Sequence, residues 1–184
     1  MTISSRFDGR IYQKPIATPA GEFRACYSER GLCGLEFPSR SKRRTGLKLE
    51  GRLPDRIRRW HAATSQAVRR ALAGRPPKRL PPLDLTAGTR FQQRVWRALR
   101  RIAWGRTWSY GQVARAVGNP RAVRAAGGAC GANPIPVLVP CHRVVAADGG
   151  LGGYSGGLNW KRALLGREGI SLEVLAKRRN AGLA

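Results

Sequence analysis

A thiol, an imidazole and a guanidinium follow one another at Cys141, His142 and Arg143, directly after an apolar run that ends at Pro140. The apolar residues Val137–Val139 predict a short buried strand, and Pro140 cannot donate to a sheet ladder, so the strand should stop or bend there. Cys141 would then stand at the end of a rigid element. A nearby imidazole and the Arg143 charge favour the thiolate, which is the reactive form of cysteine. The segment therefore suggests a nucleophilic cysteine.

This hypothesis has a geometric condition and an alternative. In a regular strand, Cys141 and His142 would point to opposite faces, so they can cooperate only if the backbone turns between them. A cysteine beside a histidine is also compatible with a buried structural thiol next to a hydrogen-bonded imidazole, because free cysteine commonly serves as core filler.

The overall charge favours a polyanionic partner. The 184 residues include 35 Lys and Arg against 10 Asp and Glu, a formal net charge of +25. Codon usage can explain abundant arginine but explains scarce acids less well, so we expect nucleic acid first and an anionic membrane surface second. No segment reaches the roughly 18–20 apolar residues that span a bilayer, and the first ten residues lack a secretion signal. We expect a cytoplasmic, nucleoid-associated protein.

The other cysteines do not predict a disulfide scaffold or a metal site. Cys26, Cys33, Cys130 and Cys141 occur in a chain that is not a small secreted protein, so reduced thiols are expected. Cys26, Cys33 and His61 have no standard zinc spacing and no evident fourth ligand. We predict no bound metal.

The first 82 residues predict a small antiparallel sheet and one helix. Strand-like segments cover residues 11–18, 22–28 and 32–37, with turn residues between them, and a helical apolar pattern covers residues 55–73. Residues 39–48 are basic and read as a solvated loop. Residues 74–82 contain Gly74 and four prolines, which suggests a linker between an N-terminal domain, 1–82, and a second domain, 83–172. A basic tail, 173–184, follows, with one strand-like segment after Ser171.

The second domain predicts a helix-turn-helix. Thr89 can cap a first helix, whose arginine-rich face reads as solvated surface. Ser109 can cap a helix that runs through Val117, and Gly118 fits the left-handed position that follows. Asn119 can then cap a second helix from Arg121 to about Cys130, and short helices across such a turn form this motif. With a last helix over residues 159–165, the fold class is α+β, with a mainly helical C-terminal domain.

The second helix of the motif is unusually small-sided. Its alanines and glycines offer few long polar side chains for reading bases in the major groove. They permit close approach of the backbone, which suits a minor groove and tolerates sequence. A tightly packed core helix would also explain the small residues, but not Arg121 and Arg124 at the exposed start.

The segment Pro140-Cys141-His142-Arg143-Val144 resembles the active-site motif of the O6-alkylguanine-DNA alkyltransferases, the methylated-DNA–protein-cysteine methyltransferase family of direct-reversal DNA repair. The similarity extends in order and spacing over about eighty residues, which makes the motif specific. Its parts are residues 88–92, 108–111, 124–128, 133–134, 153–157 and 161–169.

The resemblance implies a single-turnover enzyme that moves an alkyl group from O6-alkylguanine in double-stranded DNA to its own Cys141, without a cofactor. His142 would be the base, through a water molecule, and Glu168 would orient His142. Tyr110 would donate a proton or hydrogen bond to the leaving guanine and help to rotate the nucleotide. The resemblance leaves O4-alkylthymine open as a second substrate.

The resemblance also assigns residues around this centre. Arg124 would enter the base stack in place of the flipped nucleotide, and Asn133 would be the hinge between the DNA helix and the active-site strand. Further DNA contacts would come from Ser109, Arg121, Ala125, Ala126 and Gly127. The pocket and its support would come from Cys130, Arg143, Val144, Tyr154, Ser155, Gly156 and Lys161. We expect a monomer.

Three other protein classes fit parts of the pattern. Alkyltransferase-like lesion binders share the expected fold but have another residue at the position of Cys141. Regulatory relatives carry an additional N-terminal domain, for which residues 1–22 are expected to leave no room. A Cys–His hydrolase usually has its partner residues far apart in sequence, and it would leave the net charge of +25 unexplained.

Overall fold

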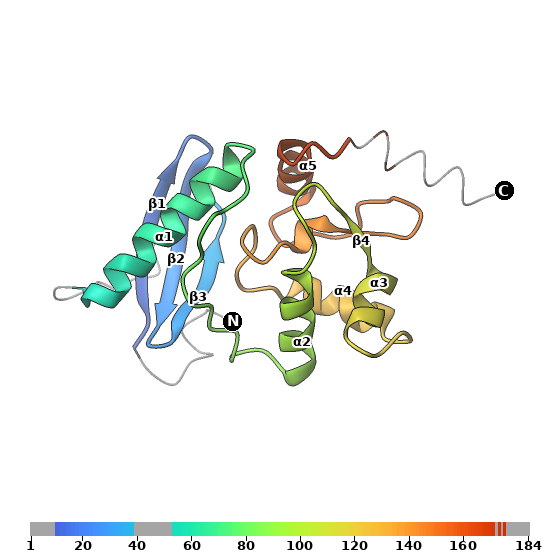
Figure 1. The fold of residues 1–184 in the computed structure, drawn as a ribbon, viewed down its shortest axis with the longest axis horizontal. Helices are drawn as coiled ribbons and strands as arrows, with labels where there is room; N and C mark the ends of the chain where they lie inside the picture. Colours follow the sequence, from blue (N-terminus) through green and yellow to red (C-terminus); the bar gives the residue numbers. More distant parts are fainter. Residues whose placement is uncertain (1–9, 39–52, 172, 174, 176–184) are drawn as a thin grey trace.

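The computed structural model describes residues 10–38 and 53–171, together with 173 and 175 (Figure 1). Its N-terminal lobe is a three-stranded antiparallel sheet in the order β1-β2-β3, built from β1 (Tyr12–Thr18), β2 (Gly21–Ser28) and β3 (Gly31–Glu36). Helix α1 (Asp55–Leu72) lies along this sheet. All four elements confirm the sequence expectation to within one or two residues.

Apolar periodicity explains this lobe. Phe23, Ala25 and Tyr27 alternate along β2 and are fully buried, and Cys26 and Ser28 on the opposite face are buried as well, so the end of this strand is covered on both faces. Ile57, Val68 and Ala71 bury one side of α1 at helical spacing. The predicted loop at 39–48 lies outside the described residues.

The C-terminal lobe contains α2 (Arg90–Leu99), α3 (Tyr110–Ala116), α4 (Val123–Gly131) and α5 (Leu158–Arg167). Two short parallel strands, β4 (Trp108–Ser109) and β5 (Val144–Val145), pair between them. Thr89 and Ser109 cap α2 and α3 through reciprocal bonds with Gln92 and Gln112. The α+β fold and the helix-turn-helix are confirmed.

The second helix of the motif begins later than expected. Gly118 has the predicted positive φ, +73°. Asn119 does not cap α4, because the Ala122 amide donates to the Asn119 carbonyl over 3.0 Å and closes a turn that contains Arg121. Helix α4 therefore starts at Val123, without a side-chain cap.

The predicted strand at Val137–Val139 is wrong. These residues form a turn in which Val137 has φ +73°, and Val139 donates its amide to the Ile135 carbonyl over 2.8 Å. Prolines at 134, 136 and 140 remove three backbone donors from the segment, so it cannot form a regular ladder. The backbone therefore turns just before Cys141, and the 3-10 turn that follows over Cys141–Arg143 removes the strand geometry that would point Cys141 and His142 to opposite faces.

One apolar core runs through both lobes and includes Phe23, Tyr27, Trp96, Leu99 and Leu164. Backbone bonds join the lobes as well, since Leu35 donates its amide to the Pro134 carbonyl over 2.8 Å. The predicted domain boundary near residue 82 stays a prediction. In the tail, Glu173 and Leu175 are helical instead of strand-like, and the remaining tail residues from 176 lie outside the described part. Among the described residues, no helix has the length and apolarity to span a membrane.

Candidate active site

Cys141 opens a single 3-10 turn, η2 (Cys141–Arg143), that also carries His142 and Arg143. A 3-10 helix has three residues per turn, so successive side chains leave it in three different directions. This local geometry separates the thiol, the imidazole and the guanidinium while keeping them on one rigid turn. All three residues are buried.

Asn133 fixes the thiol from the end of α4. Its side-chain amide donates to Cys141 Sγ over 3.0 Å and to the Val139 carbonyl over 2.8 Å. Its Oδ1 accepts the Ile135 amide over 3.0 Å. Asn133 thus ties the proline-rich turn to the helix-turn-helix, in the place where the resemblance put a hinge.

The surroundings of Cys141 disfavour the thiolate, contrary to the expectation that His142 and Arg143 favour it. Burial raises the pKa of Cys141, although the hydrogen bond from Asn133 and the Lys161 charge act in the opposite direction. Arg143 does not assist the thiol because its guanidinium binds Glu168. A reaction at Cys141 therefore needs a base to remove the thiol proton.

His142 has the protonation state of such a base. Burial lowers its pKa, against the raising effect of Glu168, so the imidazole is neutral. His142 Nε2 lies 2.7 Å from Glu168 Oε1 and must donate to this carboxylate. Nδ1 is then the unprotonated acceptor, and it is buried with no hydrogen-bond partner among the described residues.

Arg143 binds the same Glu168 carboxylate that orients His142. Its Nε donates to Glu168 Oε2 over 2.8 Å, and its Nη2 donates to Oε1 over 3.1 Å. Its Nη1 donates to the Ile102 carbonyl over 2.6 Å, and the guanidinium lies 5.3 Å from the centre of the Trp104 ring. Burial alone raises the pKa of Glu168, but hydrogen bonds from His142 and Arg143 lower it below the ordinary range.

Sequence reasoning missed this second carboxylate contact. The sequence indicated Arg143 only as a supporting residue, without a partner. The sequence did contain a signal for this contact. A buried glutamate beside a neutral histidine requires a cation, and Arg143 directly follows His142.

Lys161 connects α5 to the segment after β5. Its fully buried Nζ donates to the Val144 carbonyl over 2.6 Å and also to the Leu151 carbonyl. Burial lowers the pKa of Lys161 to about 8. Lys161 therefore has the contacts expected of a residue that supports the 151–157 loop.

Aromatic side chains border the thiol. The Tyr154 ring lies 6.5 Å from the His142 ring and nearly perpendicular to it, and no described residue gives the buried Tyr154 hydroxyl a hydrogen bond of normal geometry. Burial, and then the neighbouring Cys141, raise the pKa of Tyr154. Tyr110 is half-buried, and burial followed by Cys130 and Cys141 raises its pKa.

The other predicted pocket residues have different positions. Cys130 is buried at the end of α4, where burial raises its pKa to about 12. Gly156 packs so closely on the Phe37 ring that a side chain there would clash. Ser155 is exposed. The site therefore combines a buried wall with an open rim.

The exposed side of the helix-turn-helix carries most of the predicted DNA contacts. Arg121, Arg124 and Ala125 are exposed, and Gly127 lies against the Tyr110 ring, which a Cβ at this position would meet at ordinary contact distance. The prediction that Ala126 contacts DNA needs correction, because Ala126 is fully buried and its methyl group faces the core. Trp96 anchors α4 from beneath by donating its indole N–H to the Ala129 carbonyl over 2.8 Å.

No metal cluster is found within the described part of the chain, which lacks a group of three or more His, Cys, Asp or Glu side chains suited to hold an ion. The Cys33 thiol instead donates to the Cys26 carbonyl over 3.3 Å.

The fold and the site define a helix-turn-helix protein with a buried cysteine beside a histidine–carboxylate pair. Residues 90–170 match the family model of the 6-O-methylguanine DNA methyltransferase DNA-binding domain. A methylated-DNA–protein-cysteine methyltransferase of Shigella flexneri is 36% identical over 179 residues, which are 89% of this chain and 98% of that relative. The chain belongs to the methylated-DNA–protein-cysteine methyltransferase family.

Other relatives match over different extents. The methylated-DNA–protein-cysteine methyltransferase of Mycobacterium bovis is 60% identical over 83 residues, which are 45% of this chain and 50% of that relative. The match thus spans about half the length of the mycobacterial relative. The crystal structure of Mycobacterium tuberculosis OGT in complex with DNA has a TM-score of 0.69 and 37% identity, covering 90% of this chain and 93% of that one.

Proposed function

We propose that this protein repairs O6-alkylguanine in double-stranded DNA by moving the alkyl group to Cys141. The observation that carries the proposal is the buried Cys141 thiol on the same turn as His142, whose Nε2 lies 2.7 Å from Glu168 Oε1. Such a set is a nucleophile, a base and an orienting group. Family membership and the relative solved in complex with DNA support the same function.

In the proposed reaction, His142 Nδ1 takes the Cys141 proton through a water molecule. The sulfur lone pair then forms a bond to the alkyl carbon as the bond from this carbon to guanine O6 breaks. The electron pair stays on the guanine, which receives a proton or hydrogen bond from the Tyr110 hydroxyl. Because the displacement occurs at a saturated carbon, the reaction needs no oxyanion hole.

The product is a thioether, which has no leaving group that water displaces at a useful rate. Each molecule therefore acts once. We also propose that Arg124 enters the base stack while the target nucleotide rotates into the pocket, because flipping costs a few kcal/mol and a replacement in the stack offsets part of this cost. Exposed Arg121 and Ala125, with half-buried Gly127, would lie against the minor groove.

The remaining assignments follow from this reaction. The net charge of +25 supports sequence-tolerant binding through backbone phosphates. We infer a cytoplasmic monomer that associates with the nucleoid, with residues 83–172 as the transferase domain. The same chemistry extends to O4-alkylthymine, provided that the pocket accepts a pyrimidine.

The direct test is intact-mass measurement after mixing the protein with a duplex that contains O6-methylguanine. We expect a gain of one methyl group on the peptide that contains Cys141. Cys141→Ala should bind the duplex without a mass gain, and an unmethylated duplex should leave the wild type unchanged. A methyl group on Cys130, or sustained turnover, would contradict the proposal.

A further inference from the structure

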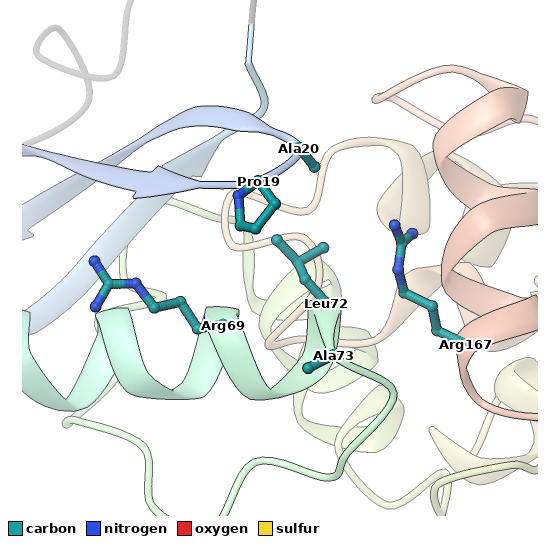
Figure 2. A pocket seen from close by; sticks show the side chains of 6 residues that line it. All are labelled: Pro19, Ala20, Arg69, Leu72, Ala73 and Arg167. Atoms are coloured by element: carbon teal, nitrogen blue, oxygen red, sulfur yellow. The ribbon is translucent and has the colours of Figure 1, made fainter.

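A pocket of about 330 Å³ lies where the two lobes meet, and its lining residues have no role in the proposed reaction. It is formed by the turn between β1 and β2, the C-terminal end of α1 and the last residue of α5 (Figure 2). This volume is at the small end of the range of small-molecule sites. The lining residues are Pro19, Ala20, Arg69, Leu72, Ala73 and Arg167.

The pocket has an apolar floor and a cationic edge. Figure 2 shows the Leu72 and Pro19 side chains facing each other, with Arg167 extending from α5 on the other side. Arg69 points away from Arg167 along α1, and its Nε donates to the Ala17 carbonyl over 3.2 Å. The two guanidinium groups therefore do not converge, and Arg167 is the cation that faces the apolar floor.

One guanidinium nitrogen of Arg167 has no acceptor within the described part of the chain. Its Nη1 is buried without a hydrogen-bond partner among the described residues. Leaving a buried donor of a charged group unpaired is costly, so an acceptor is expected there. The adjacent Glu168 cannot serve, because His142, Arg143 and the Gly105 amide already bind its two oxygens. No acidic residue lines the pocket.

We propose that this pocket binds a small amphipathic carboxylate. A carboxylate accepts two parallel bonds from the edge of a guanidinium, and its single charge suits a partly apolar site better than a phosphate dianion does. The apolar part of the ligand would lie over Leu72 and Pro19. The ligand would bridge the lobes one residue from Glu168.

Binding of hexanoate, measured by calorimetry at constant ionic strength, tests the proposal without reference to alkyl transfer. Acetate supplies the charge without the chain, and hexanamide supplies the chain without the charge. We expect saturable binding of one hexanoate per chain, with acetate and hexanamide each at least tenfold weaker.

Variants locate the site. Arg167→Gln and Leu72→Ser should each weaken hexanoate binding at least tenfold, whereas Arg162→Gln, an exposed arginine on the same helix, should leave it unchanged. Far-UV circular dichroism verifies that each variant is folded. If Arg167→Gln does not fold, Leu72→Ser locates the site in its place. The proposal is overturned if hexanoate does not saturate, if acetate binds equally well, or if Arg162→Gln has the effect of Arg167→Gln.

Discussion

Replacing Arg143 with methionine should destabilise the protein far more than loss of an ordinary surface arginine. The change keeps most of the apolar stem and removes two hydrogen bonds to Glu168 and one to the Ile102 carbonyl. Glu168 would keep only His142 and the Gly105 amide as donors. Its side chain is 3% exposed, so water cannot replace the lost cation.

Removing one member of a buried ion pair costs about 3–5 kcal/mol, because the other charge remains buried without compensation. We expect this loss in the free energy of unfolding of Arg143→Met at neutral pH. Arg143→Lys should recover only a part, because an ammonium group cannot bind both carboxylate oxygens as a planar fork. Glu168→Gln in the Arg143→Met background should restore stability, since it removes the uncompensated charge.

Urea denaturation, followed by tryptophan fluorescence, measures these differences between the wild type, Arg143→Met, Arg143→Lys and the double variant. Arg162→Met is the matched control on exposed surface and should change stability by less than about 0.5 kcal/mol. A loss below about 1 kcal/mol in Arg143→Met, or a further loss in the double variant, would refute the reasoning that Arg143 compensates a buried Glu168 charge.

Four further predictions concern pH, the reactive thiol and DNA. Because the folded-state pKa of Glu168 lies below the unfolded value, its contribution to stability should be complete at neutral pH and disappear as the pH falls through the folded pKa. On acid titration, Glu168→Gln should therefore lose less free energy of unfolding than the wild type. Glu168→Gln should also slow alkyl transfer while the protein stays folded, and a thiol titration should show a raised Cys141 pKa. An unchanged titration and transfer rate would show that Glu168 does not act on Cys141 through His142. Arg124→Ala should slow repair of duplex DNA more than reaction with free O6-methylguanine base, whereas equal slowing of both would show that Arg124 does not enter the stack. For the wild type, log affinity should fall with log salt by about 0.9 per phosphate contacted, which a titration series in salt measures.

Local sequence signals predicted the helices and the sheet well, because their information lies within a few residues. Thr89 with Gln92 and Ser109 with Gln112 specify helix starts directly, and Gly118 specifies the turn between α3 and α4. The Val137–Val139 segment failed because a short apolar run does not distinguish a strand from a buried turn. The flanking prolines carried the opposing signal.

Long-range pairs account for what sequence reasoning could not derive from the residues. Glu168 is 26 positions from His142, and only the family resemblance connected them. The contact between Arg143 and Glu168 was missed because no local pattern predicts which buried carboxylate a guanidinium meets. Ala126 was misplaced for a related reason: the alanines of α4 look alike in sequence, and only packing decides which of them faces inward.

Phe37 gives the N-terminal lobe an influence on the pocket beside the thiol. Its ring lies 5.8 Å from the Tyr154 ring and 4.9 Å from the Trp160 ring, and Gly156 packs against it. The wall opposite His142 is therefore supported by a residue of the sheet lobe, which sequence analysis left without a site. Natural variation at Phe37 should accordingly alter which alkyl groups fit, even when every residue of the transferase lobe is preserved.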